Sequence, residues 1–241
     1  RTAIEEWLSK QQRSPITNLA MGTKVFAATQ VKTMIERMVN SDALPRDKVS
    51  AWRARLKEQE EVERTRRAAD AGDAASAAKL GCWLRRGDMG LAKDVVRAFG
   101  YFKSAARAGD ATAMGRLSSA YRNGEGIEQH AALALRWAAA ASALGNGVGM
   151  ITLAGMYAEG KAGLPADKEE EFELRVGAHG QKTMNSRGVY KLAMMYAEGQ
   201  GTAVDIAMAT TKMREAIRLN DCSSGVEAAR AWLQSRGLPL D

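Results

Sequence analysis

The chain has 241 residues, of which 46% are apolar and only 6% are aromatic, and alanine is abundant. This composition favours closely packed helices over a β-sandwich. The 35 basic and 28 acidic residues give a net charge of +7 but are interspersed. A basic stripe with interleaved aromatics is absent, as is an apolar run of about 20 residues. We therefore expect neither nucleic acid nor membrane as a partner.

The cysteines and histidines do not have the spacing of a metal site. Cys82 and Cys222 are far apart in the chain, as are His130 and His179, so four zinc ligands cannot assemble locally. We expect no cofactor and no metal. The cysteines fit small core residues of a reducing compartment, and no signal-peptide pattern opens the chain. The expected location is cytoplasmic, with the nucleus as an alternative.

Residues 1–40 predict a small α+β unit. Thr2 and Glu5 have the spacing of a capping box for a short helix, and Pro15 forces the preceding residue into extended geometry. A short extended segment is expected at residues 24–26. A second amphipathic helix is expected from about Thr29.

This order of elements resembles the C-terminal half of a U-box, the zinc-free relative of the RING domain. The resemblance covers residues 1–39 and rests on Arg1-x-x-Ile4-Glu5-x-Trp7-Leu8, then Ser14-Pro15-Ile16-Thr17-Asn18, then Val25-Phe26 and the closing helix. U-box proteins are ubiquitin ligases that recruit a ubiquitin-conjugating enzyme to a shallow groove. The resemblance implies that Trp7 and Pro15 contact that enzyme. Asn18 matches the position where many U-boxes place a basic residue that braces the charged ubiquitin.

Residues 41–71 predict a helical connector. Pro45 breaks the preceding helix, and the charged stretch from Lys48 to Ala71 carries i,i+3 and i,i+4 pairs of opposite charge. Trp52, Leu56 and Val62 are its main apolar anchors. Its last residues resemble residues 105–110, which suggests the second helix of a degenerate first repeat.

Residues 72–222 contain four copies of one pattern. Leucines recur at steps of 37, 36 and 39, and each is followed by a small residue, by Leu or Tyr four residues on, and by Gly seven residues on. The glycines suit helix C-termini. Asp94, Asp167 and Asp205 then suit the N-caps of second helices. The recurring leucines are Leu80, Leu117, Leu153 and Leu192.

This pattern resembles the Sel-one-like repeat (SLR) family, a cousin of the tetratricopeptide repeat. The resemblance implies an α/α superhelical solenoid of helical hairpins that binds protein substrates or partners. Residues 223–241 predict a capping helix and tail, with Val226, Ala229, Ala231, Trp232 and Leu233 packing on the last repeat. Tyr121, Tyr157 and Tyr196 are expected in the core. Arg116, Arg122 and Arg187 are candidate contacts, with solvated surface charge as the alternative.

Two functions follow from these resemblances. The first is a U-box ubiquitin ligase that uses the solenoid to recruit substrates. It acts without a covalent intermediate, so it needs no catalytic nucleophile, and no catalytic residue is assigned. The alternative is a non-catalytic adaptor or scaffold in which the half U-box is vestigial or truncated. No Ser/His/Asp arrangement, phosphate-binding loop or carboxylate pair favours a metabolic enzyme.

Overall fold

The computed structural model of the chain describes residues 33, 37, 39 and 46–240, and within these it is all-α. The chain divides into two compact units, Arg1–Lys57 and Glu58–Asp241. Trp7, Pro15, Asn18 and the expected strand at residues 24–26 lie outside the described residues. The predicted U-box therefore stays a prediction, whereas the predicted helical repeats can be compared with the structure directly.

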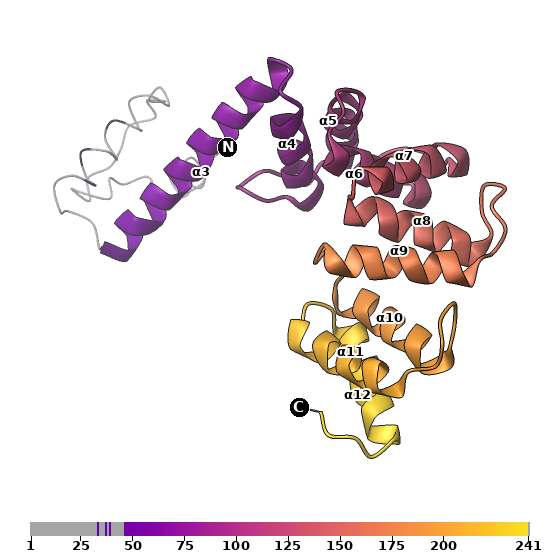
Figure 1. Cartoon of the computed structure of the whole chain (residues 1–241). Coiled ribbons are helices and arrows are strands. Elements are labelled where there is room, and N and C mark those ends of the chain that lie inside the picture. Colours follow the sequence, from indigo (N-terminus) through magenta and orange to yellow (C-terminus); the bar gives the residue numbers. More distant parts are fainter. Residues whose placement is uncertain (1–32, 34–36, 38, 40–45, 241) are drawn as a thin grey trace. The chain divides into compact units, whose positions relative to one another are not determined.

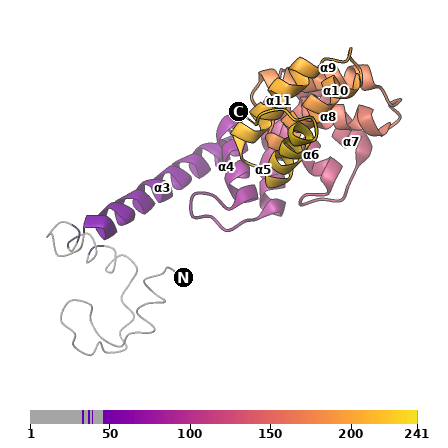
Figure 2. The same ribbon diagram turned by 90° about the horizontal axis from the view of Figure 1, so that it is seen from below.

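Helix α3, Arg46–Asp70, opens the stretch 46–240. Figure 2 shows it as one uninterrupted rod. It agrees with the helix predicted for residues 48–71. Val62 is buried on this helix, while Trp52 and Leu56 are only partly buried. Most of its other side chains are exposed, and ion pairs such as Arg66–Glu63 stabilise an exposed helix of this kind only weakly.

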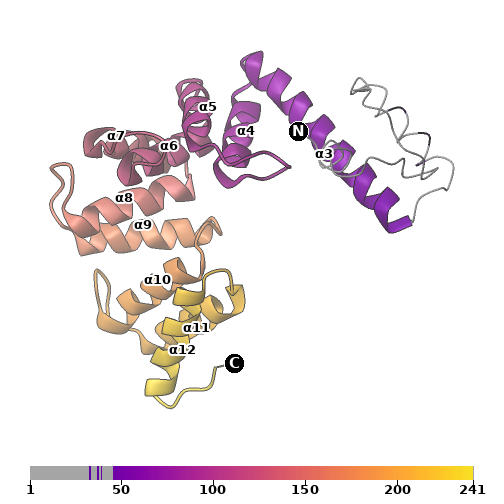
Figure 3. The same cartoon turned by 180° about the vertical axis from the view of Figure 1, so that it is seen from behind.

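Four helical hairpins and a final helix follow α3 (Figure 1). The hairpins are α4 (Ala74–Arg86) with α5 (Val95–Arg107), α6 (Ala111–Asn123) with α7 (Ala131–Ala143), α8 (Gly147–Glu159) with α9 (Lys168–Gly180), and α10 (Ser186–Glu198) with α11 (Ile206–Leu219); the final helix is α12 (Ser223–Ser235). We call α4, α6, α8 and α10 the first helices and their partners the second helices. Figure 3 shows the same sequence of hairpins from behind.

The ends of these helices follow from local chemistry, as the repeat pattern predicts. Every first helix stops at a glycine in the left-handed region, with φ between 62° and 79° at Gly87, Gly124, Gly160 and Gly199. The side chains of Asp94, Asp167 and Asp205 accept hydrogen bonds from backbone N–H groups of the following second helices. His130 takes the same role in the second hairpin, where its ring accepts from the N–H of Leu133.

Small residues and aromatic rings fill the space within and between hairpins. Gly81, Ser118, Ala154 and Ala193 are all buried, as expected for positions where helices approach closely. Tyr121 is 9% exposed and packs edge-on against Phe99, with 5.4 Å between ring centroids. Tyr157 and Tyr196 are only partly buried, so the expectation of core tyrosines is met fully by Tyr121 alone.

The fourth hairpin and the final helix form one core. The second helices of the first three hairpins carry an aromatic residue at one position, Tyr101, Trp137 and Phe172. In α11 this position is Lys212, and the neighbouring Met213 is completely buried instead. Helix α12 packs against both α10 and α11, with four of the five predicted residues buried against the last repeat. The fifth, Ala231, is exposed because it falls on the opposite face of the helix.

The sequence predicts small core residues at the two cysteines, and the structure corrects this in part. Both are free thiols and only partly buried; Cys82 packs against the core of the first hairpins, whereas Cys222 precedes α12. His130 is the cap of α7. His179 lies between hairpins, where its ring contacts Glu215 at 2.8 Å.

Candidate functional site

The first helices share a set of basic side chains that lie where one hairpin meets the next. In the repeat pattern these side chains occupy the position just before the leucine (Lys79, Arg116, Lys191) or five residues after it (Arg85, Arg122). Neither position is needed for the core, since the leucine, the small residue and the Leu or Tyr already supply the packing. The basic residues are therefore free to serve contacts between hairpins or contacts with a ligand.

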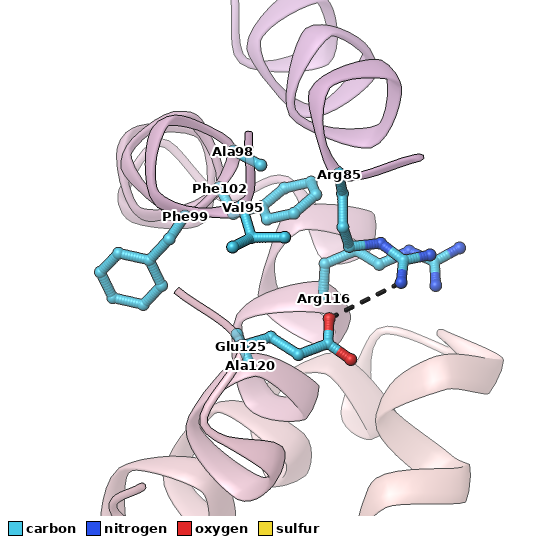
Figure 4. A pocket seen from close by; sticks show the side chains of 8 residues that line it. All are labelled: Arg85, Val95, Ala98, Phe99, Phe102, Arg116, Ala120 and Glu125. Atoms are coloured by element: carbon cyan, nitrogen blue, oxygen red, sulfur yellow. Dashed lines mark ion pairs between the residues drawn. The ribbon is translucent and has the colours of Figure 1, made fainter. Parts of the chain in front are cut away.

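At the junction of the first and second hairpins, three charged side chains line a small pocket between α4, α5 and α6 (Figure 4). Arg85 and Glu125 approach to 3.6 Å, too far for a hydrogen bond, and Arg116 lies beside them. The Nε atoms of both arginines are buried and have no hydrogen-bond partner among the described residues. The remaining lining is apolar: Val95, Ala98, Phe99, Phe102 and Ala120.

At the junction of the second and third hairpins, the basic residue is already paired. Arg122 donates a hydrogen bond of 2.5 Å to Glu159, and Lys161 pairs with the other carboxylate oxygen. The Lys161 bond is the main reason why the pKa of Glu159 lies below its ordinary value, although partial burial opposes the shift. The guanidinium of Arg122 covers Gly155, where a Cβ atom would lie 2.5 Å from Nη1.

At the junction of the third and fourth hairpins, a buried carboxylate holds two cations. Arg175 makes two hydrogen bonds to Oε1 of Glu171, at 3.0 and 2.8 Å, and Lys168 binds Oε2 at 2.8 Å. Burial alone would raise the pKa of Glu171. The bonds and positive charges of Lys168 and Arg175 outweigh it, so the pKa is lowered and the carboxylate stays ionised.

Helix α10 adds two basic side chains to this third junction. Lys191 and Arg187 are exposed, and no hydrogen bond or ion pair joins either of them to another described residue. The pKa of Lys191 lies below its ordinary value, first because of desolvation and then because of the positive charges of Arg175 and Arg187. The side chains named at this junction are thus four cations, Lys168, Arg175, Lys191 and Arg187, and one carboxylate, Glu171.

The residues proposed from the sequence fall into two groups. Trp7, Pro15 and Asn18 lie outside the described residues, so their roles stay predictions. Arg116 lies at the first junction, whereas Arg122 and Arg187 come from different hairpins and both act on Lys191. The sequence reasoning missed Lys191 and Arg175. Lys191 could have been found by aligning the residue before each repeat leucine, whereas Arg175 could not, because its role depends on burial with Glu171.

Neither a metal-binding cluster nor a membrane-spanning helix occurs in the part of the chain that the structure describes. Within residues 33, 37, 39 and 46–240, no three His, Cys, Asp or Glu side chains gather in a way that could hold a metal ion. Across the same part of the chain, no helix combines the length and the apolar character that crossing a bilayer requires.

Comparison with known proteins shows what the repeats are similar to. Residues 74–110, 111–146 and 186–210 match the family model described as Sel1 repeat. A protective antigen of uropathogenic Escherichia coli strains, described as displaying an SLR fold, is 29% identical and has a TM-score of 0.58 over 73% of this chain. A Sel1 repeat protein from Oxalobacter formigenes is 23% identical, with the same TM-score over 74% of the chain, and supports the fold alone.

The chain covers only part of these solved structures, 37% of the first and 50% of the second. Among the curated proteins, the comparison finds no match. These likenesses agree with the helical hairpins described above and leave the activity of the chain to be argued from its own residues.

Proposed function

We propose that this chain, which contains Sel1-like repeats, is a protein-interaction scaffold that holds partner proteins on the surface of its first helices. The observation that carries the proposal is that the recurring positions of each repeat have different roles. The glycines end helices and the leucines fill the core, whereas basic side chains such as Arg116 and Lys191 are left without partners inside the described chain. Unsatisfied cationic groups around a rigid framework suit binding to another protein.

A site-specific photocrosslinking experiment tests this proposal. A photoreactive amino acid is placed at Asn123 or Lys191, which are exposed on first helices, in the full chain within its native cells. Matched control sites are Ser104 and Glu173, exposed on second helices. We expect discrete protein adducts from the first-helix sites only. The absence of adducts at both first-helix sites, or equal adducts at the control sites, would contradict the proposed surface.

A second candidate function rests on the resemblance of residues 1–39 to the C-terminal half of a U-box. We propose that Trp7 and Pro15 contact a ubiquitin-conjugating enzyme and that the repeats present the substrate to it. An aromatic ring and a rigid proline offer contact area at a small cost in conformational entropy. Under this function the chain works in the cytoplasm or nucleus, where ubiquitin transfer takes place.

Autoubiquitination of the full-length protein tests the ligase proposal. We expect Trp7→Ala and Pro15→Ala to abolish most of the activity. Asn18→Arg should increase it, because a guanidinium restores the charge that many U-boxes place at this position. If the wild-type protein is inactive, or if none of the three changes alters its activity, the chain is a scaffold without ligase activity.

A further inference from the structure

Lys191 and Arg187 form a pair of free cations on one face of α10. They are four residues apart, so one helical turn brings their Cβ atoms to about 5–6 Å. Both side chains are exposed, and neither has an ion-pair or hydrogen-bond partner among the described residues. Like charges at this spacing destabilise a helix slightly, so their placement costs stability unless an anion neutralises them.

The carboxylate that acts on Lys191 and the carboxylate that pairs with Arg122 are both already occupied. Glu171 has both oxygens occupied, one by Arg175 and one by Lys168. Glu159 has one oxygen bound by Arg122 and the other by Lys161. Each carboxylate therefore already serves two cations before Lys191 and Arg187 are counted.

The lowered pKa of Lys191 agrees with this shortage of free carboxylates. Besides desolvation, three guanidinium groups lower its pKa, those of Arg175, Arg187 and Arg122. Glu171 is the one carboxylate that acts on it in the opposite direction. The charges of α6, α9 and α10 thus combine into a positive field at the exposed end of Lys191, into which an external anion would be drawn.

We propose that Lys191 and Arg187, backed by Arg122 and Arg175, bind an acidic segment of a partner protein. The proposal rests on the scaffold function above and names the chemistry of its partner. Alternate side chains of an extended peptide are about 6.6–7 Å apart, a spacing that two long basic side chains one helical turn apart can span. Acidic residues at alternate positions of an extended segment therefore match the pair.

Fluorescence anisotropy with two labelled peptides tests the proposal on the full chain. One peptide alternates Ser and Glu over twelve residues, and the other replaces every Glu by Gln. We expect binding of the Glu peptide only, weakening as salt is raised from about 50 to 200 mM. Equal binding of the two peptides would overturn the proposal, because charge would then play no part.

Charge reversal locates the binding. The double variant Lys191→Glu/Arg187→Glu should weaken binding of the Glu peptide about tenfold. Folding is preserved because both side chains are exposed and because Glu suits the first turn of a helix at residue 187. The control Lys57→Glu/Lys93→Glu changes the net charge equally at exposed sites elsewhere and should weaken binding less than about twofold. Equal loss in both variants would overturn the assignment to α10.

The same variants separate this inference from the scaffold proposal. If crosslinked partners persist at Asn123 in the Lys191→Glu/Arg187→Glu variant, the scaffold function stands and the acidic segment does not. If no partner crosslinks to the wild-type chain, the scaffold function itself is wrong. A single-stranded DNA of equal charge is a further competitor. If that DNA binds more tightly than the Glu peptide, and does so through Lys191 and Arg187, the ligand of this site is a nucleic acid and the proposal is overturned.

Discussion

The ring of Phe102 occupies the space that a side chain on Gly81 would need. A Cβ atom at Gly81 would lie 2.7 Å from Cε1 of Phe102, and both residues are buried between α4 and α5. The first hairpin closes tightly because a residue without a side chain faces a large ring. In the later repeats the position of Gly81 is taken by Ser118, Ala154 and Ala193.

We expect Gly81→Ala to destabilise the chain by about 1–3 kcal/mol, because the added methyl group overpacks the helix crossing. Gly100→Ala is the matched control, since Gly100 is exposed in α5 and a Cβ atom there would meet nothing within 4 Å. That change should stabilise the chain by about 0.5–1 kcal/mol through helix propensity. Urea denaturation measures both. A stabilising effect at both sites would mean that Phe102 moves aside freely.

The loop of the fourth hairpin makes a similar close approach. Gly201 has φ of +71°, and a Cβ atom there would lie within 2 Å of the backbone oxygen of Lys168. Gly163 has φ of +81° in the equivalent loop of the third hairpin, but a Cβ atom there would meet nothing within 4 Å. We expect Gly163→Ala to cost about 1 kcal/mol from backbone strain. Gly201→Ala should cost at least twice as much. The melting temperatures of the two variants check this difference. Equal losses would show that the loop at Gly201 does not pack tightly against the backbone of α9.

The buried pair of Glu171 and Arg175 should control stability in acid. Glu171→Gln leaves the Arg175 guanidinium buried without a counterion and should cost about 3–5 kcal/mol at neutral pH. Glu170→Gln is the control, because Glu170 is exposed and the change should stay within about 0.5 kcal/mol.

The sign of the pH effect follows from the lowered pKa of Glu171. Its contribution is fully present above the ordinary value of 4.5 and is lost as the pH falls through the lower pKa of the folded state. The difference in unfolding free energy between wild type and Glu171→Gln should therefore shrink only below about pH 4.5. A difference that is constant from pH 7 down to pH 3 would contradict an ionised, paired Glu171.

Asp221 ties the loop before α12 to the start of α10. Its Oδ1 accepts from the hydroxyl of Ser186 at 2.6 Å and from the N–H of Ser186 at 2.8 Å, and Ser186 is completely buried. Asp221→Ala should leave both donors unsatisfied and cost about 1–3 kcal/mol. The control Asp70→Ala, at an exposed residue at the end of α3, should change stability by less than about 0.5 kcal/mol. In Asp221→Ala, hydrogen exchange at the backbone N–H of Ser186 should be faster than in the wild type. An unchanged exchange rate would contradict the hydrogen bond between Ser186 and Asp221.

Much of the fold could be predicted from the sequence because its signals are local. A glycine seven residues after the repeat leucine ends the first helix, since the residue there needs a left-handed conformation. An aspartate such as Asp94 starts the second helix through its own side chain. Local signals fail at Ala231, where an apolar residue in a helix was assigned to the core although the phase of α12 places it in solvent.

Less of the candidate site could be predicted. The repeat alignment indicates that Arg122 and Lys191 are not core residues, yet it does not show which of them is already paired. Arg122 meets Glu159 across 37 residues of sequence, and that pair exists only because α6 and α8 pack together. The same packing leaves Lys191 without a carboxylate of its own.

The sequence by itself determined the repeat, the ends of its helices and the leucine positions of its core, because hydrogen-bonded caps and helical periodicity act over a few residues. Only the tertiary structure decided which charged side chains form ion pairs and which have no partner. Glu171 pairs with Arg175 and Lys168, and Glu159 pairs with Arg122 and Lys161. Charge balance depends on distances between helices that are remote in the chain, and this is why Lys191 and Arg187 emerge as free cations only once the hairpins are packed.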